Sequence, residues 1–166
     1  PPPPPLVPRA LRIGVRERLR FDGTVEIQLS RASLAAGIRK LRQAYVDAVA
    51  VCYLHAYRDS SHELATSQYV ETPLPKAYIS LSSEVLPQIK EYERVCTTVV
   101  NAYVGPTLSR YLSLLADRLQ IAGYRRDVLI MQSHGGVAPL SDAARLAAGA
   151  ILSGPAGGIA GGCYCS

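Results

Sequence analysis

The apolar positions near the start of the chain alternate, and further along they recur at helical spacing. Two β-prone runs, Leu11–Arg20 and Val25–Leu29, flank an Asp-Gly pair, which is a strong hairpin signal. Apolar residues then recur every three or four positions over residues 34–45, and Ser30 or Ser33 is suited to cap that segment. This part of the chain therefore predicts a β-hairpin followed by an amphipathic helix.

Short apolar runs alternate with helical segments in the rest of the chain. The runs predict buried strands at Asp47–Leu54, Ala77–Leu81, Val128–Gln132 and Ala150–Leu152. The segments between them predict helices at His62–Val70 with Ser61 as cap, from Glu84 to about Gly123 with a break or kink at Gly105-Pro106, and at Asp142–Ala148 with Ser141 as cap. We therefore expect an α/β fold, in which an N-terminal β-hairpin precedes alternating helices and mainly parallel strands.

Length and composition narrow the class of protein. The chain has 166 residues, of which 48% are hydrophobic and 19% charged, so a folded domain is expected rather than disorder. No apolar run approaches the roughly 18 residues of a membrane-spanning helix, and the first residues lack the apolar core of a signal peptide. We therefore expect a cytoplasmic protein with no membrane partner.

Positive charge is concentrated in residues 1–42, which hold nine Lys/Arg and three Asp/Glu. A basic hairpin could neutralise nucleic-acid phosphates, but only one aromatic residue, Phe21, lies within it. A solvated face, or a surface that meets an acidic partner domain, is favoured, and we expect no nucleic-acid partner. Pro1–Pro8 holds six of the twelve prolines and predicts a polyproline-like tail or linker.

Eight of the thirteen glycines lie from Gly135 onward, in two turns that follow predicted strands. Glycine lets backbone amides approach a phosphate, and a helix that began near Ala156 or Ile159 would add its dipole, with Pro155 at its first position. The alternative is that both turns merely pack against neighbouring chain. The candidate nucleotide-binding residues are Ser133, Gly135, Gly136, Ser153, Gly154, Pro155, Ala156, Gly157 and Gly158.

Common catalytic and metal motifs are missing. The sequence contains no G-x-G-x-x-G and no Walker A loop, and H-E-x-x-H fails because position 66 is Thr. Cys163 and Cys165 lack a second ligand pair, so no metal site is expected. Cys52 and Cys96 are expected to be small buried side chains. No general base can be named.

Three polar residues keep two readings each. His55 and His134 lie in predicted loops, where each could contact a ligand or serve only the loop itself. Arg94 could pair with a carboxylate or an anionic ligand, or it could lie on a solvated or interface face.

Six blocks of sequence carry a family resemblance. In chain order they are Val15–Arg18, His55–Tyr57 with His62-Glu63, Ser80–Pro87, Glu91–Arg94 with Thr97–Tyr103, Gln132–Gly136, and Ser153–Gly158. Together they resemble the hydantoinase/oxoprolinase family, which includes N-methylhydantoinase, 5-oxoprolinase and the acetone and acetophenone carboxylases. The resemblance implies part of an actin-like ATPase (ribonuclease H-like) fold. Position 134 departs from the family, which usually has Asn or Asp there.

The resemblance also implies an arrangement of domains. Residues 1–8 would be a linker, residues 9–83 the end of the family's N-terminal domain, and residues 84–166 the truncated start of the hydantoinase A/oxoprolinase domain. The family's Asp-x-Gly-Gly-Thr phosphate loops are absent. We therefore expect an internal fragment whose first partner is the remainder of the same polypeptide.

In such enzymes ATP, with Mg²⁺, phosphorylates an amide or ketone oxygen, and the activated carbon accepts water or a carboxyl donor. The first hypothesis is therefore a fragment of an ATP-dependent hydrolase that opens cyclic amides of the hydantoin or 5-oxoproline type. A subunit fragment of a ketone carboxylase and a non-catalytic α/β binding module are the alternatives. The resemblance implies a second enzyme subunit as partner, and the 166 residues alone are expected to turn over no ATP.

Overall fold

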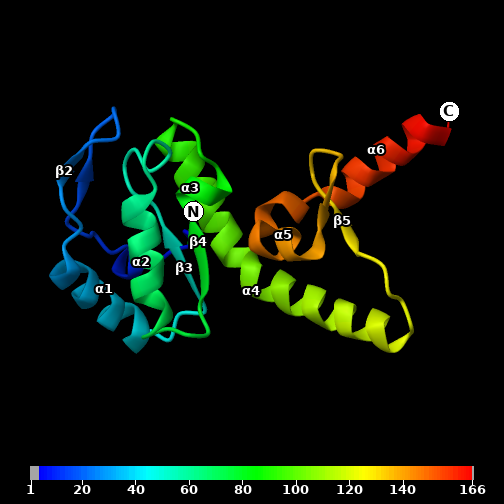
Figure 1. Ribbon diagram of the computed structural model, residues 1–166, viewed down its shortest axis with the longest axis horizontal. Coiled ribbons are helices and arrows are strands. Elements are labelled where there is room, and N and C mark those ends of the chain that lie inside the picture. Colours follow the sequence, from blue (N-terminus) through cyan, green and yellow to red (C-terminus); the bar gives the residue numbers. More distant parts are fainter. Residues whose placement is uncertain (1–3, 166) are drawn as a thin grey trace. The chain divides into compact units, whose positions relative to one another are not determined.

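The computed structural model describes residues 4–165 (Figure 1). Two compact units follow one another along the chain, the first reaching Tyr103 and the second beginning at Val104. The boundary between them falls inside the long helix α4 (Glu91–Ile121). Each unit is described by itself below.

The first unit opens with the predicted hairpin. After a single 3₁₀ turn at Arg9–Leu11, strands β1 (Arg18–Leu19) and β2 (Val25–Ile27) pair antiparallel. They are shorter than the β-prone runs that predict them. Helix α1 (Arg31–Gln43) follows, and its N-cap is Ser30, whose Oγ accepts a hydrogen bond from the Ser33 N–H at 3.4 Å. The hairpin and the first helix are thus confirmed.

A parallel β-α-β unit forms the centre of this first unit. Strands β3 (Ala48–Val51) and β4 (Tyr78–Leu81) pair in parallel and are joined through α2 (Ser61–Glu71). The cap of α2 is Ser60 rather than the predicted Ser61, because the Asp59 carboxylate accepts from the Ser61 N–H at 2.8 Å. A short helix, α3 (Ser82–Val85), follows β4 directly.

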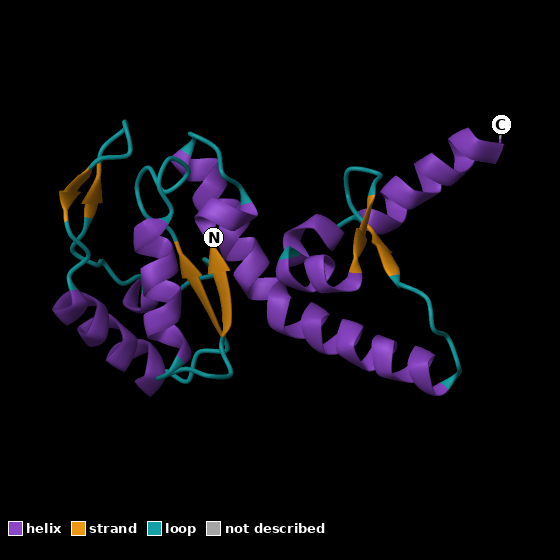
Figure 2. Ribbon diagram, in the orientation of Figure 1, coloured by secondary structure: helices purple, strands orange, loops and turns teal. Residues whose placement is uncertain are grey.

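Helices cover both faces of the β3–β4 pair (Figure 2). Val49 and Val51 belong to the apolar core, together with Leu34 of α1 and Val70 of α2. Residues of the opposite face meet α4, where the Asn101 side chain donates to Ser80 Oγ at 2.9 Å. The two strands therefore lie in a helix–sheet–helix sandwich, which is the environment that parallel strands require.

Helix α4 runs without a break through Pro106, so the break that was one of the two predicted outcomes at Gly105-Pro106 is wrong. Proline removes only one helical N–H, and the neighbouring hydrogen bonds suffice to carry the helix across that position. The predicted end is confirmed. Gly123 has φ +85°, and the Tyr124 N–H donates to the Leu119 carbonyl at 2.9 Å, as in a Schellman cap.

The second unit differs most from expectation. Strand β5 (Leu129–Met131) confirms the predicted run, but it pairs antiparallel with β6 (Val137–Pro139), which was not predicted. Helix α5 (Leu140–Arg145) begins before Ser141, so Ser141 is not its cap, and a 3₁₀ turn, η2 (Ala147–Ala150), follows it.

The strand predicted at Ala150–Leu152 is wrong. The Ile151 N–H closes a 3₁₀ turn onto the Ala148 carbonyl at 3.3 Å, and Leu152 has φ +61°, which no strand accommodates. Helix α6 (Ser153–Cys165) then begins at once.

The α/β class is confirmed, and it is consistent with an actin-like ATPase fold. The expectation of mainly parallel strands is corrected, because residues 4–165 contain one parallel pair and two antiparallel pairs. Both antiparallel pairs are hairpins, which need only a short turn, whereas β3 and β4 need the crossover helix α2. No helix in this range is long and apolar enough to span a bilayer.

Candidate functional site

A buried carboxylate joins the carboxyl ends of the two parallel strands. Glu63 of α2 is 0% exposed. Its Oε1 accepts hydrogen bonds from the Tyr53 N–H at 2.9 Å and the Ser82 hydroxyl at 2.6 Å, and its Oε2 accepts from the Ser83 N–H at 2.8 Å. Tyr53 follows β3, and the two serines begin α3 directly after β4, so one side chain links the ends of both strands.

Arg94 of α4 lies beside this carboxylate network and is 1% exposed. Its guanidinium donates to the Tyr53 carbonyl at 2.9 Å and to the Gln88 carbonyl at 3.1 Å, and it lies 5.5 Å from the centre of the Tyr57 ring. The solvated-face interpretation of Arg94 is therefore wrong. The guanidinium instead donates hydrogen bonds to two carbonyls that lie outside the helices and strands.

Two further polar residues of α4 extend the contacts toward the sheet. The Thr98 hydroxyl donates to the Arg94 carbonyl at 2.7 Å, and Asn101 donates to Ser80 as described above. Both side chains are completely buried. We call Glu63, Arg94, Thr98 and Asn101 with their partners the polar network. It occupies the strand ends where α/β proteins place ligands.

The histidines of this region have structural partners. His62 Nδ1 lies 2.9 Å from Glu17 Oε2, and both side chains are nearly inaccessible. His55 adopts φ +60°, and its ring meets Tyr57 edge-on at 6.0 Å. Thr66 stands where the H-E-x-x-H motif would need its second histidine, and its hydroxyl lies 2.9 Å from the Tyr53 OH. The described residues hold no cluster of three His, Cys, Asp or Glu suited to a metal.

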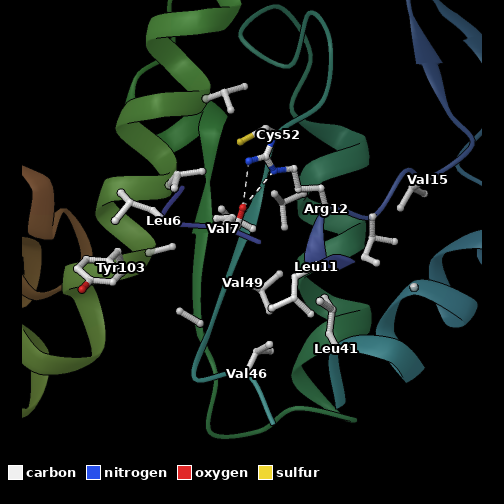
Figure 3. Close-up of a pocket in the computed structure, with 18 of the residues that line it drawn as sticks. Leu6, Val7, Leu11, Arg12, Val15, Leu41, Val46, Val49, Cys52 and Tyr103 are labelled. Carbon is white, nitrogen blue, oxygen red and sulfur yellow. Dashed lines mark hydrogen bonds between the residues drawn. The ribbon is translucent and has the colours of Figure 1, made fainter. Parts of the chain in front are cut away.

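Cys52 lies half-buried between β3 and the polar network, whereas Cys96 is exposed, so the prediction that Cys96 is buried is wrong. Cys96 lies on the part of α4 that lines a cavity beside β3 (Figure 3), and its side chain stays exposed there. Burial raises the pKa of the Cys52 thiol to about 12, and the Glu63 carboxylate adds to the effect. Burial also raises the pKa of the Tyr53 phenol to about 12.

The Cys52 thiol makes the stability of the first unit fall at high pH. Above pH 9.0, its ordinary pKa, the unfolded chain releases the thiol proton that the folded chain holds until about pH 12. Stability is therefore fully present below pH 9.0 and declines above it. We expect the urea midpoint to fall between pH 8 and pH 11, and to fall less in Cys52→Ala. Exposed Cys96→Ala is the control, and equal declines in both variants would contradict this account.

The first glycine segment, Ser133–Gly136, forms the turn of the β5–β6 hairpin. The Gln132 N–H donates to the Gly136 carbonyl at 2.8 Å, and Gly135 has φ +87° with open space where a Cβ would stand. His134 is exposed, and its Nδ1 accepts from the Gly136 N–H at 3.2 Å. Gly135 thus allows a tight turn whose tip faces open space.

The second glycine segment, Ser153–Gly158, forms the first turns of α6 rather than the predicted loop. Pro155 is the third residue of the helix, not the first, and it is tolerated there because first-turn N–H groups lack intrahelical partners. A Cβ at Gly157 would lie 3.4 Å from Met131 Cγ of β5, so the glycine permits close packing. The other residues of the segment are exposed or half-buried.

The second unit brings the two glycine segments to the same strand end. Met131 at the end of β5 packs on Gly157 of α6. Two residues after Met131, Ser133 donates its N–H to the Gly149 carbonyl at 2.7 Å. Both glycine segments therefore lie next to the end of β5. The polar network of the first unit was not predicted as a site, although the family-like blocks contain Glu63, Arg94, Thr98 and Asn101. Its local signal is only charge and polarity.

Comparisons with known proteins agree with this architecture. The family profile described as hydantoinase/oxoprolinase matches residues 94–166, and that of the hydantoinase/oxoprolinase N-terminal region matches residues 3–73. The chain is 38% identical over 156 residues to caprolactamase subunit alpha of Pseudomonas jessenii, covering 94% of this chain and 22% of the relative. It is 32% identical to the acetone carboxylase beta subunit of Xanthobacter autotrophicus, over 97% of this chain and 23% of the relative.

Two solved structures are similar. The ATP-dependent caprolactamase from Pseudomonas jessenii matches with a TM-score of 0.78 and 37% identity, covering 84% of this chain and 20% of that one. Nucleotide-free acetone carboxylase matches with a TM-score of 0.86 and 31% identity, over 98% of this chain and 23% of that one. Our chain thus spans less than a quarter of these relatives. It belongs to the hydantoinase/oxoprolinase family.

Proposed function

We propose that this chain is part of an ATP-dependent hydrolase that opens cyclic amides through a phosphorylated intermediate. The observation that carries the proposal is its similarity to caprolactamase subunit alpha over 94% of its length. A ring amide resists water because its nitrogen is a poor leaving group and its carbonyl carbon is weakly electrophilic. Phosphorylation of the carbonyl oxygen makes that carbon electrophilic, and water then adds to it.

The chain's own contribution is binding of the nucleotide phosphates at the two glycine segments. Ser133, Gly135 and Gly136 offer a turn whose tip is open to solvent, and the first amides of α6, at Ser153 and Gly154, lack intrahelical acceptors. The remaining residues that we propose for this site are Pro155, Ala156, Gly157 and Gly158. Backbone N–H groups placed in this way stabilise negative charge without a lysine.

Mg²⁺ belongs to the proposal only as the counterion of the bound nucleotide. We place the reaction in the cytoplasm. We also propose a domain boundary between residues 83 and 84, with residues 1–8 as a linker. The gap between the matched regions 3–73 and 94–166 supports the boundary. Relatives named as enzyme subunits support a second subunit as partner.

A ketone carboxylase is the second candidate. Acetone carboxylase matches over 98% of this chain with a TM-score of 0.86, against 84% and 0.78 for caprolactamase. The same activation would serve both reactions, because phosphorylation of an enolate oxygen parallels that of an amide oxygen. The two candidates differ in the step that follows: in the hydrolase the activated carbon accepts water, and in the carboxylase it accepts a carboxyl donor.

Turnover by the longer polypeptide that carries this sequence, with its companion subunit, tests the proposal. We expect ATP hydrolysis that depends on a cyclic amide, such as caprolactam or 5-oxoproline, and yields the ring-opened acid. Turnover that requires bicarbonate and a ketone instead would favour the carboxylase. ATP hydrolysis stimulated by neither substrate would refute both candidates.

Gly135→Val is expected to weaken ATP binding to that polypeptide at least tenfold, because a β-branched residue cannot hold φ +87° at the turn. Gly123→Val is a matched control, since Gly123 also has a positive φ and open space around it but ends α4. Titration calorimetry with ATP measures both. If the two variants lose the same affinity, the loss reflects backbone strain and Gly135 does not contact the nucleotide.

A further inference from the structure

The β1–β2 hairpin turns at the dipeptide Asp22-Gly23, a link that can rearrange spontaneously in water. Glycine carries no Cβ, so its nitrogen can approach the carboxyl carbon of the aspartate before it. Asp22 is exposed, and Gly23 is half-buried with φ +91°. Water and the two reacting groups therefore meet at one place on the surface of the first unit.

The rearrangement proceeds through a succinimide ring. The Gly23 nitrogen forms a bond to Cγ of Asp22, and the carboxyl hydroxyl leaves with the hydrogen of that nitrogen as water. A water molecule then opens the ring at one of its two carbonyl carbons. Opening at Cγ restores aspartate, whereas opening at the main-chain carbonyl gives isoaspartate, whose backbone runs through Cβ and Cγ and is one carbon longer. Water is the only co-reactant.

In the folded turn, both reacting groups are held by other partners. The Gly23 N–H donates to the Arg20 carbonyl at 3.0 Å. Oδ1 of Asp22 accepts two hydrogen bonds from Thr24, one from its N–H at 2.9 Å and one from its hydroxyl at 2.7 Å. Ring closure requires the nitrogen to leave the first of these contacts and the carboxyl group to leave the other two.

The contacts from Thr24 also change the charge state of the carboxyl group. The Thr24 N–H first, and then its hydroxyl, hold the pKa of the Asp22 carboxyl below its usual value. Ring closure needs the protonated carboxyl, because only a neutral hydroxyl can leave as water. Thr24 therefore fixes the carboxyl group in place and keeps it in its unreactive, ionised form.

We propose that Asp22 is a site of spontaneous conversion to isoaspartate, and that the hydrogen bonds from Thr24 suppress the conversion while the hairpin is folded. The hairpin is small, because β1 has two residues and β2 has three, all three of them exposed. Such a hairpin opens locally more readily than the core of a domain. Each opening releases Asp22 and Gly23 from their partners, so isoaspartate accumulates as the protein ages.

Conversion at this position would disturb the structure around the turn. Leu19 of β1 pairs with Val25 of β2 across the turn, and a longer backbone between them cannot keep that register. The tip also lies close to the loop after β3, since a Cβ placed on Gly23 would stand 3.3 Å from Cγ of Arg58. Isoaspartate would therefore open the hairpin and loosen its contact with that loop.

Isomer-resolved mass spectrometry tests the proposal. The longer polypeptide that carries this sequence, with its companion subunit, is incubated at neutral pH, either folded or in urea. It is then digested, and isoaspartate is measured in the peptide that spans residues 20–26. We expect isoaspartate to form in both samples and to form roughly tenfold faster in urea, as for a hairpin that is open for about a tenth of the time. Equal rates in the two samples, or no isoaspartate in either, would overturn the proposal.

Thr24→Val isolates the contribution of the threonine. Valine keeps the N–H and the β-branched shape but lacks the hydroxyl that donates to Asp22 at 2.7 Å. We expect conversion about threefold faster in the folded polypeptide and unchanged in urea, since one of the two hydrogen bonds is lost.

Glu26→Gln is the matched control, because it weakens the contact between Arg20 Nε and Glu26 Oε2 at 3.4 Å in the same hairpin without touching Asp22. It should leave the rate nearly unchanged. Equal acceleration by both variants would show that opening of the hairpin alone sets the rate, and would overturn the role assigned to Thr24. The comparison of folded and urea-treated wild type decides the site itself, whether or not either variant folds.

Discussion

Glu63→Ala is expected to lower the unfolding free energy of the first unit by roughly 3–5 kcal/mol. The substitution removes a completely buried carboxylate and leaves the Tyr53 N–H, the Ser83 N–H and the Ser82 hydroxyl without their acceptor. Each buried donor without a partner costs free energy, and these donors lie just beyond the strand ends, where no β-ladder stabilises them. Urea unfolding followed by circular dichroism measures the loss.

Glu71→Ala is the matched control for this experiment. Glu71 ends the same helix, and its side chain is exposed, so its removal should change the unfolding free energy by less than about 0.5 kcal/mol. If Glu63→Ala proved as mild as Glu71→Ala, the carboxylate would not be the acceptor that holds the two strand ends together.

Arg94→Met is expected to cost roughly 2–4 kcal/mol in the same measurement. Methionine fills much of the space of the arginine stem but cannot donate to the Tyr53 and Gln88 carbonyls. It also loses the contact of the guanidinium with the Tyr57 ring. Because these carbonyls belong to the loop after β3 and to the segment before α4, the loss should appear together with faster amide exchange in both segments.

The exposed Arg110 of the same helix provides the comparison. Arg110→Met should leave the unfolding free energy nearly unchanged, since an exposed arginine exchanges its contacts with water for little net gain. An equal loss from both substitutions would mean that arginine at either position contributes only through its helix propensity.

Local signals in the sequence were sufficient for much of the fold. The Asp-Gly pair, the serine at position 30 and Gly123 each act through hydrogen bonds with their near neighbours, and each has the predicted role. The β3 and β4 runs are apolar, short and bounded by polar residues, so their length and burial could be read directly. These features depend on contacts within a few residues along the chain.

Features that depend on distant partners could not be read in this way. Ala150–Leu152 has the composition of a strand, but β5 pairs with β6, and the 150–152 segment makes a 3₁₀ turn. Residues 150–152 could form a strand only if a neighbouring strand paired with them, and β5 pairs with β6 instead. A short apolar run carries no information about which segment will pair with it. The same holds for Ser153–Gly158, whose glycines were expected in a loop and lie in a helix packed on Met131.

The polar network was hidden for a different reason. Charged residues are placed at the surface by default, because burial of an unpaired charge is prohibitive. Glu63 and Arg94 escape that cost only because loops 20 and 41 residues away along the chain supply their hydrogen-bond partners. Such pairing is invisible to any reading of periodicity. The nucleotide-binding residues of the second unit could be proposed because glycine clusters are visible locally.

The Glu63 carboxylate, shared by the segments after β3 and β4, also bears on how this protein can evolve. Residues 53 and 82–83 are far apart in sequence, yet they depend on the same pair of oxygens. A substitution that moves the donor at residue 53 therefore changes which substitutions are tolerated at residues 82–83, and the reverse holds as well. Among homologues of this chain, position 63 should therefore change only together with compensating changes at residues 53 and 82–83.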